Sequence, residues 1–287
     1  MQPLFEYRDR FGGYETRVLE LEGEGPPLVL LHGYADSADT WRHVLDRLGK
    51  RDRRAIAVDM PGFGTAAPFA SGPMLPQLDR FAAAVVEQVS AEHGTEAIVV
   101  GNSLGGCVAL RLAGAVEMPA GLPLAGIVPI APAGLDMARW FSIVERDVLL
   151  RTLVGLPAPV PQRVVRDVVG RVYRTLAFAE PGDVDDGVIE AFTGHFRDRA
   201  GISRHLTTAR RLLPELTDPF DLGAVSRPVM LVWGTRDRMV SPAGSEQIIT
   251  ALPGTRLELL DGCGHCPQIE DSARIVDLLL DFSAQPV

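Results

Sequence analysis

Residues 99–106 read Val-Val-Gly-Asn-Ser-Leu-Gly-Gly, which indicates a sharp turn between two regular elements. The apolar run at 97–100 predicts a short buried strand before the turn, and the helical spacing of apolar residues predicts a helix over 107–115. A strand that turns directly into a helix at Ser103 strains the backbone there, and glycine at 101 and 105 removes the collisions that side chains would make. Ser103 then lies at the amino end of a helix, which favours developing negative charge.

The rest of the chain alternates between strand-like and helix-like patterns on both sides of this turn. Mainly apolar runs predict strands at 28–31, 55–58, 126–130 and 229–233, with a weaker edge strand at 16–21. The alternation of strand and helix that resumes after Pro228 predicts a further strand at 256–260. Amphipathic spacing predicts helices at 41–48, 76–92, 244–252 and 269–282. This alternation predicts an α/β fold, with a doubly wound and mostly parallel sheet covered on both faces.

The pattern changes between residues 132 and 219. No strand pattern occurs there, and helical stretches at 140–154 and 188–213 are interrupted by prolines. We therefore expect one core, built from residues 1–133 and 219–287, with a helical insertion at 134–218.

The bulk composition limits the partners. The chain has 287 residues, a net charge of −9 and a pI near 5.2, which argues against nucleic acid and anionic membrane surfaces as partners. No apolar run reaches the ~18 residues of a membrane-spanning helix, so we expect no integral membrane association. The start of the chain lacks the pattern of a secretory signal, and three cysteines make no disulfide framework, so we expect a cytoplasmic protein. The oligomeric state stays open.

Two further residues extend the chemistry of Ser103. Asp237 follows the strand predicted at 229–233, and His265 follows the strand predicted at 256–260. The carboxyl ends of parallel strands meet at one edge of the sheet, where ligands bind. His265 titrates in the range needed to take the proton of Ser103, and Asp237 can hold the required tautomer of His265. Asp136 is the competing candidate for the acid.

An oxyanion site needs two N–H donors aimed at one oxygen. The residue after the serine, Leu104, supplies the first donor, and Tyr34 after the strand at 28–31 is the best candidate for the second, with Ala35 as the alternative. His32 is a tempting base, but we expect it to brace this loop through ring hydrogen bonds.

Five short motifs carry a resemblance to a known family. They are H-G-Y at 32–34, D-M-P-G-F-G at 59–64, G-N-S-L-G-G at 101–106, W-G-x-x-D at 233–237 and G-x-G-H at 262–265. Through them the chain resembles the capped, single-domain esterases and C–C hydrolases of the α/β-hydrolase superfamily, over about 16–132 and 220–283. The resemblance implies that 134–218 forms a lid over the active site and that Ser103 lies on a nucleophile elbow.

These observations predict a serine hydrolase that cleaves an ester or related acyl bond of a small molecule, with no cofactor and no metal. Hydrolysis of a carbon–carbon bond in a vinylogous diketone is the alternative within enzymes, and a non-catalytic ligand receptor is the alternative outside them. Serine instead of aspartate at 103 excludes the alkyl-enzyme chemistry of haloalkane dehalogenases and epoxide hydrolases.

The remaining candidates concern the pocket and the cysteines. The candidate pocket residues are Phe63, Asn102, Trp140 and Phe141. Cys263 and Cys266 have C-x-x-C spacing around His265, but three ligands at most are present and His265 already has a task, so we expect no zinc or redox site there.

Overall fold

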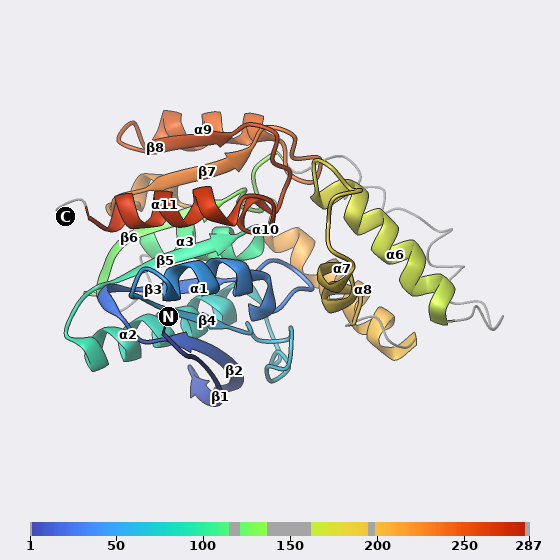
Figure 1. The fold of residues 1–287 in the computed structure, drawn as a ribbon, viewed down its shortest axis with the longest axis horizontal. Coiled ribbons are helices and arrows are strands. Elements are labelled where there is room, and N and C mark those ends of the chain that lie inside the picture. The colour runs from blue at the N-terminus through green and yellow to red at the C-terminus, as the bar shows by residue number, and fades with distance from the viewer. Residues whose placement is uncertain (1, 115–120, 137–161, 195–198, 285–287) are drawn as a thin grey trace.

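The computed structural model describes residues 2–114, 121–136, 162–194 and 199–284 (Figure 1). Within these ranges the chain forms an 8-stranded sheet with the order β1-β2-β4-β3-β5-β6-β7-β8. The strands are β1 Leu4–Phe11, β2 Tyr14–Leu21, β3 Glu24–Leu31, β4 Arg53–Val58, β5 Ala97–Asn102, β6 Leu124–Ile130, β7 Met230–Gly234 and β8 Arg256–Leu260. From β4 to β8 every neighbouring pair is parallel, whereas β2 pairs antiparallel with both β1 and β4. The predicted doubly wound, mostly parallel sheet is confirmed.

Helices cover both faces of this sheet (Figure 1). They are η1 Ala38–Trp41, α1 Arg42–Gly49, α2 Leu75–His93, α3 Leu104–Gly114, η3 Leu222–Ala224, η4 Pro242–Gly244, α9 Ser245–Ala251, α10 Pro267–Glu270 and α11 Ser272–Ser283. Apolar residues of α1 and α11 share one buried cluster with Leu28 and Val100, and those of α2 and α3 share another with Val29 and Val99. Alternate residues of a central strand thus enter opposite layers, which explains the uninterrupted apolar runs of these strands.

Between β6 and β7, the residues that the structure describes form three further helices, namely α6 Gln162–Ala177, α7 Asp186–Thr193 and α8 Arg199–Glu215. Figure 1 draws them together on the side of the sheet towards which the arrowheads of β5 and β7 point. We call them the inserted helices. The helical stretch predicted at 188–213 corresponds to most of α7 and α8. The helical pattern at 140–154 lies outside the described residues.

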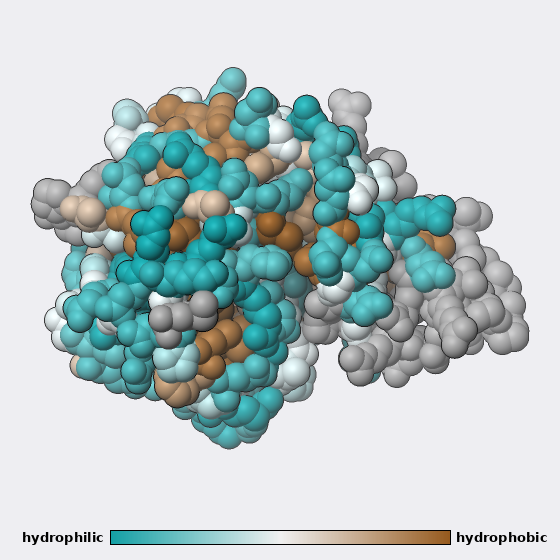
Figure 2. All heavy atoms as spheres, viewed as in Figure 1, coloured by the Kyte–Doolittle hydropathy of each residue, from teal (hydrophilic) through white to brown (hydrophobic). Residues whose placement is uncertain are grey.

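The amino-terminal strands differ from the prediction. The expected edge strand at 16–21 is β2, but β1 pairs with its outer side and forms the actual edge. The sequence gives little signal for β1 because most of its residues are exposed and many are charged. Figure 2 shows hydrophobic residues as separate patches on a largely hydrophilic face, one of them near the position of β1 and β2. In the described part of the chain, no helix is long and apolar enough to cross a membrane.

Candidate active site

Ser103 occupies the turn between β5 and α3. Its φ angle is +53°, in the left-handed region that costs a non-glycine residue roughly 1–2 kcal/mol. The N–H of Ser103 donates to the carbonyl of Ile130 at 2.9 Å, and the carbonyl of Ser103 accepts from the N–H of Cys107 at 2.9 Å. Bonds on both sides therefore hold the strained turn that the glycine pattern predicted.

The two flanking glycines have no room for a side chain. A Cβ atom at Gly101 would lie 2.1 Å from the carbonyl carbon and oxygen of Gly105. A Cβ atom at Gly105 would lie 2.3 Å from the carbonyl oxygen of Leu31 in β3. The close approach of α3 to two central strands therefore requires glycine at both positions.

Asp237 and His265 form a buried pair at the carboxyl ends of β7 and β8. His265 Nδ1 lies 2.7 Å from Asp237 Oδ2. The other carboxylate oxygen, Oδ1, accepts the N–H groups of Met239 at 2.7 Å and Val240 at 3.0 Å. The indole of Trp233 also donates to Oδ2, at 3.2 Å. Backbone and indole donors thus fix the carboxylate that orients the imidazole.

The backbone of His265 is fixed as well. Its N–H donates to the carbonyl of Ala177, the last residue of α6, at 2.7 Å. Its carbonyl accepts from Asn102 Nδ2 at 2.9 Å. Asn102 directly precedes Ser103, so one side chain connects the serine turn to the loop that carries the histidine.

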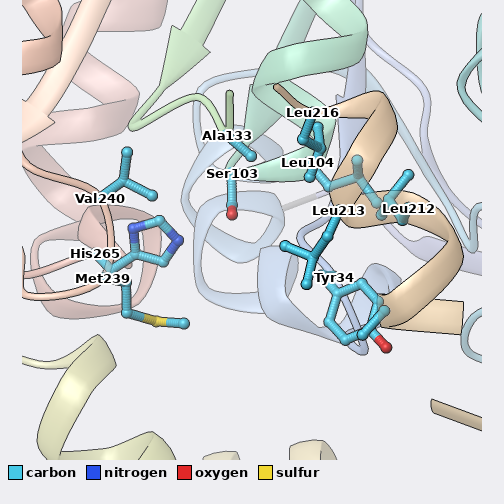
Figure 3. Close-up of a pocket in the computed structure, with 11 residues that line it drawn as sticks. Tyr34, Ser103, Leu104, Ala133, Leu212, Leu213, Leu216, Met239, Val240 and His265 are labelled. Atoms are coloured by element: carbon cyan, nitrogen blue, oxygen red, sulfur yellow. The ribbon is translucent and has the colours of Figure 1, made fainter. Parts of the chain in front are cut away.

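Ser103 and His265 line the same cavity, which has a volume of about 50 Å³ (Figure 3). One wall consists of α8, which contributes Ala209, Leu212 and Leu213, and of Leu216, which follows the end of the helix. Met239 and Val240, from the loop that follows Asp237, lie on the side of His265. Among the described residues that line the cavity, His265 has the only ionisable side chain besides the phenol of Tyr34.

The two expected oxyanion residues, Leu104 and Tyr34, also line this cavity. Leu104 is the first residue of α3, where backbone N–H groups have no partner within the helix. Neither the N–H of Leu104 nor that of Tyr34 has an acceptor in the described part of the chain. Two residues that line the cavity with Ser103 therefore carry backbone N–H groups without an acceptor among the described residues.

The expected pocket residues have other environments. Phe63 is 1% exposed and packs edge-to-face on Tyr34 at 5.3 Å between ring centroids, so it supports the cavity wall from behind. Asn102 is 2% exposed and directs its amide to the carbonyl of His265 instead of the cavity. Neither lines the cavity. Trp140 and Phe141 lie outside the described residues.

The other candidates for the acid and the base, Asp136 and His32, have different environments. The side chain of Asp136 is exposed, whereas Asp237 is bonded to His265, so Asp136 does not hold the acid position. Both ring nitrogens of His32 contact backbone, Nδ1 the carbonyl of Gly33 at 2.7 Å and Nε2 the N–H of Met60 at 2.8 Å. This is the bracing role expected for His32.

The thiols of the C-x-x-C pair are buried and shielded from reaction. Burial raises the pKa of Cys263 to about 12 and raises the pKa of Cys266 well above its ordinary value. The hydroxyl of Tyr173 lies 3.7 Å from Cys266 Sγ. In the part of the chain that the structure describes, no group of three or more His, Cys, Asp or Glu side chains is arranged to hold a metal ion.

The alpha/beta hydrolase family profile matches residues 28–278. The chain belongs to this family. Two curated relatives are pimeloyl-[acyl-carrier protein] methyl ester esterases. The esterase of Nitrosomonas europaea is 29% identical over 252 residues, covering 87% of this chain and 92% of the relative. The esterase of Xanthomonas campestris is 28% identical over 278 residues, covering 93% and 98%. These matches support a hydrolase.

The solved structures agree on the fold of this hydrolase. The 2-hydroxy-6-oxo-6-phenylhexa-2,4-dienoate hydrolase of Rhodococcus sp. strain RHA1 superposes with a TM-score of 0.75 and 21% identity. It covers 98% of this chain and 99% of its own. A likeness at this level of identity concerns the architecture alone.

Sequence reasoning missed the cavity wall that α8 provides. Its cavity residues Ala209, Leu212 and Leu213, together with Leu216 just after the helix, follow the i, i+3, i+4, i+7 spacing of one helix face. That periodicity was available in the sequence as the signal for a buried face in the insertion. Met239 and Val240, two and three residues after Asp237, also line the cavity and were not predicted to do so.

Proposed function

We propose that this chain is a cofactor-independent serine hydrolase that cleaves a carboxylic ester of a small molecule through an acyl-enzyme. The observation that carries the proposal is that Ser103 and His265 line one cavity while Asp237 is hydrogen-bonded to the far side of the imidazole. Since Nδ1 of His265 is bonded to Asp237, Nε2 is the nitrogen available to Ser103.

The proposed reaction has two halves. Ser103 Oγ attacks the ester carbonyl carbon as its proton moves to His265 Nε2, and the carbonyl oxygen becomes an oxyanion. The C–O bond to the alcohol then breaks, and His265 returns the proton to the departing alcohol. In the second half, His265 takes a proton from water, the hydroxide attacks the acyl carbon, and the proton passes to Ser103 Oγ as the carboxylic acid leaves.

The N–H groups of Leu104 and Tyr34 stabilise the oxyanion in this proposal. Their support is that both residues line the cavity and that neither N–H has an acceptor among the described residues. Loss of one such donor typically lowers kcat by about 10²–10³-fold in serine hydrolases. The amino end of α3 adds a favourable dipole at the same place.

The cavity lining favours an ester over a vinylogous diketone. A dienoate substrate, such as the one in the name of the Rhodococcus enzyme, carries a carboxylate that needs a basic partner when it is buried. The described lining has no arginine or lysine and is mainly aliphatic. An uncharged, apolar acyl group suits it better. The curated relatives are named as methyl ester esterases, which supports the same choice.

We further propose that the insertion at 134–218 acts as the lid of the active site. Its support is that α8, one of the inserted helices, forms a wall of the cavity over Ser103. The lid then determines which acyl groups enter, whereas the residues of the core perform the chemistry.

Labelling with a fluorophosphonate probe tests the mechanism. The wild type is expected to be labelled, and Ser103→Ala is expected to abolish labelling while its circular dichroism spectrum stays unchanged. A folded wild type that binds small esters without labelling or turnover supports the receptor alternative and contradicts the proposal.

Turnover of p-nitrophenyl butyrate is then compared with that of a dienoic diketone. Faster turnover of the diketone would mean that the enzyme hydrolyses a carbon–carbon bond and not an ester.

A further inference from the structure

Glu270 connects two segments that lie far apart in the sequence. It ends α10, and its carboxylate accepts one backbone N–H with each oxygen. Oε2 accepts the N–H of Gly264 at 2.7 Å, and Oε1 accepts the N–H of Ala179 at 2.7 Å. Gly264 directly precedes His265, and Ala179 lies two residues beyond the end of α6. One half-buried carboxylate therefore bridges the loop of the proposed base and the inserted helices.

The two bridged segments also touch each other directly. The N–H of His265 donates to the carbonyl of Ala177 at 2.7 Å. A Cβ atom at Gly264 would lie 2.7 Å from both the carbonyl oxygen of Ala177 and the nitrogen of Ala179. The end of α6 therefore packs against the backbone of the histidine loop with no space between them, and Glu270 completes the contact with charge-assisted bonds.

We propose that Glu270 is a positioning residue, which holds the His265 loop against the end of α6 so that the imidazole stays in reach of Ser103. This inference rests on the function proposed above, with His265 as the base. Its physical basis is that a carboxylate satisfies both N–H groups at once, which no neutral side chain of similar size does. Displacement of a catalytic group by about 1 Å lowers the rate by about 10²-fold.

The charge of Glu270 allows an experiment to distinguish a positioning role from a role in packing alone. Burial raises the pKa of Glu270, while the N–H groups of Ala179 and Gly264 oppose that shift. The charge of Asp237 raises the pKa of Glu270 further, and the charge of His265 lowers it. A carboxylate near an imidazole favours the protonated form of the imidazole. Removing the charge of Glu270 therefore moves the acid limb of the kcat–pH profile to lower pH. A purely structural change leaves that limb in place.

Two variants of Glu270 separate its charge from its reach. Glu270→Gln keeps the length but loses the charge, and its amide group faces one of the two N–H donors. Glu270→Asp keeps the charge but is one methylene too short to bridge both segments. Asp261→Asn is the matched control, because Asp261 is an exposed carboxylate on the same loop that bonds to the hydroxyl of Thr235. Steady-state kinetics with p-nitrophenyl butyrate and fluorophosphonate labelling rates are measured from pH 5 to 9.

We expect Glu270→Gln to lower kcat by about tenfold with little change in KM, and to move the acid limb to lower pH. Glu270→Asp is expected to lower kcat while the acid limb stays in place, and Asp261→Asn is expected to match the wild type. Wild-type kinetics in both Glu270 variants overturn the inference, and so does a loss of kcat that only follows the folded fraction. Failure of both variants to fold makes Glu270 a structural residue and also overturns it. A wild type that is not labelled contradicts the proposed function instead.

Discussion

The hydroxyl of Tyr34 donates a hydrogen bond to the backbone carbonyl of His205 in α8. In a helix this carbonyl and the N–H of Ala209, four residues later, are the two partners of an ordinary helical hydrogen bond. The phenol is therefore bonded into the hydrogen-bond ladder of an inserted helix. The backbone N–H of the same residue is the proposed oxyanion donor, so Tyr34 connects the position of α8 to the geometry at Ser103.

Tyr34→Phe is expected to lower kcat towards p-nitrophenyl butyrate, because the ring and the backbone N–H remain while the attachment to α8 is lost. The stability loss should be about 1 kcal/mol or less, since the two helix groups can bond to each other once the hydroxyl is gone. Tyr14→Phe is the control, because the phenol of Tyr14 donates to Gln77 at 2.5 Å, away from the cavity. Equal effects of both variants on kcat would contradict the coupling.

Asp237→Asn is expected to lower kcat by about 10⁴-fold, because an amide in this position stabilises the wrong tautomer of His265. The comparison is Asp136→Asn, which changes an exposed carboxyl that follows the neighbouring strand. Turnover of a p-nitrophenyl ester at pH 7 and labelling by a fluorophosphonate measure both. A larger loss in Asp136→Asn than in Asp237→Asn would reassign the acid.

Gly105→Ala is expected to destabilise the fold by about 3 kcal/mol, because the added Cβ would lie 2.3 Å from the carbonyl oxygen of Leu31 and backbone atoms relax little. Gly254→Ala provides the control, since a Cβ there meets nothing within 4 Å. Urea denaturation followed by circular dichroism gives the free energy of unfolding of both. A Gly105→Ala protein as stable as the wild type would mean that α3 does not approach β3 so closely.

The position of the proposed catalytic residues was predictable because each carries a local signal. Ser103 lies between glycines that only a tight strand-to-helix turn requires, and Asp237 and His265 each follow a predicted strand. The order of parallel strands then brings their ends to one edge of the sheet. None of these inferences needed knowledge of how the inserted helices pack.

The contacts between the insertion and the core were not predictable in the same way. Glu270 binds the backbone N–H groups of Gly264 and Ala179, and a backbone donor leaves no trace in the identity of its side chain. Phe63 was expected in the pocket, yet it packs against Tyr34 and lies outside the cavity lining. Which side chain reaches the cavity and which supports it from behind depends on packing between distant segments.

Ala209→Leu is expected to shift the preference towards short acyl groups, because Ala209 lines the cavity on α8 and the larger side chain fills part of it. Steric exclusion of about 1–3 kcal/mol corresponds to a loss of roughly fivefold to 160-fold in kcat/KM for hexanoate relative to acetate esters. Thr207→Leu, on an exposed position of the same helix, serves as the control. An unchanged hexanoate-to-acetate ratio in Ala209→Leu would exclude this wall from acyl binding.

Asp36 lies in the loop that follows Tyr34. Burial raises the pKa of Asp36 to about 7, against the opposing effect of hydrogen bonds from Ser37 and Thr40. Between about pH 4 and pH 7 the folded protein therefore keeps a proton that the unfolded chain has released, so this carboxyl lowers stability progressively as the pH rises.

Asp36→Asn removes that loss while its amide oxygen can still accept the N–H of Ser37. The variant is expected to be more stable than the wild type at pH 8, with the difference shrinking towards pH 5. Urea denaturation at several pH values measures it, and Asp218→Asn makes the same change at an exposed position. A difference that does not depend on pH, or that shrinks as the pH rises, would contradict a raised pKa at Asp36.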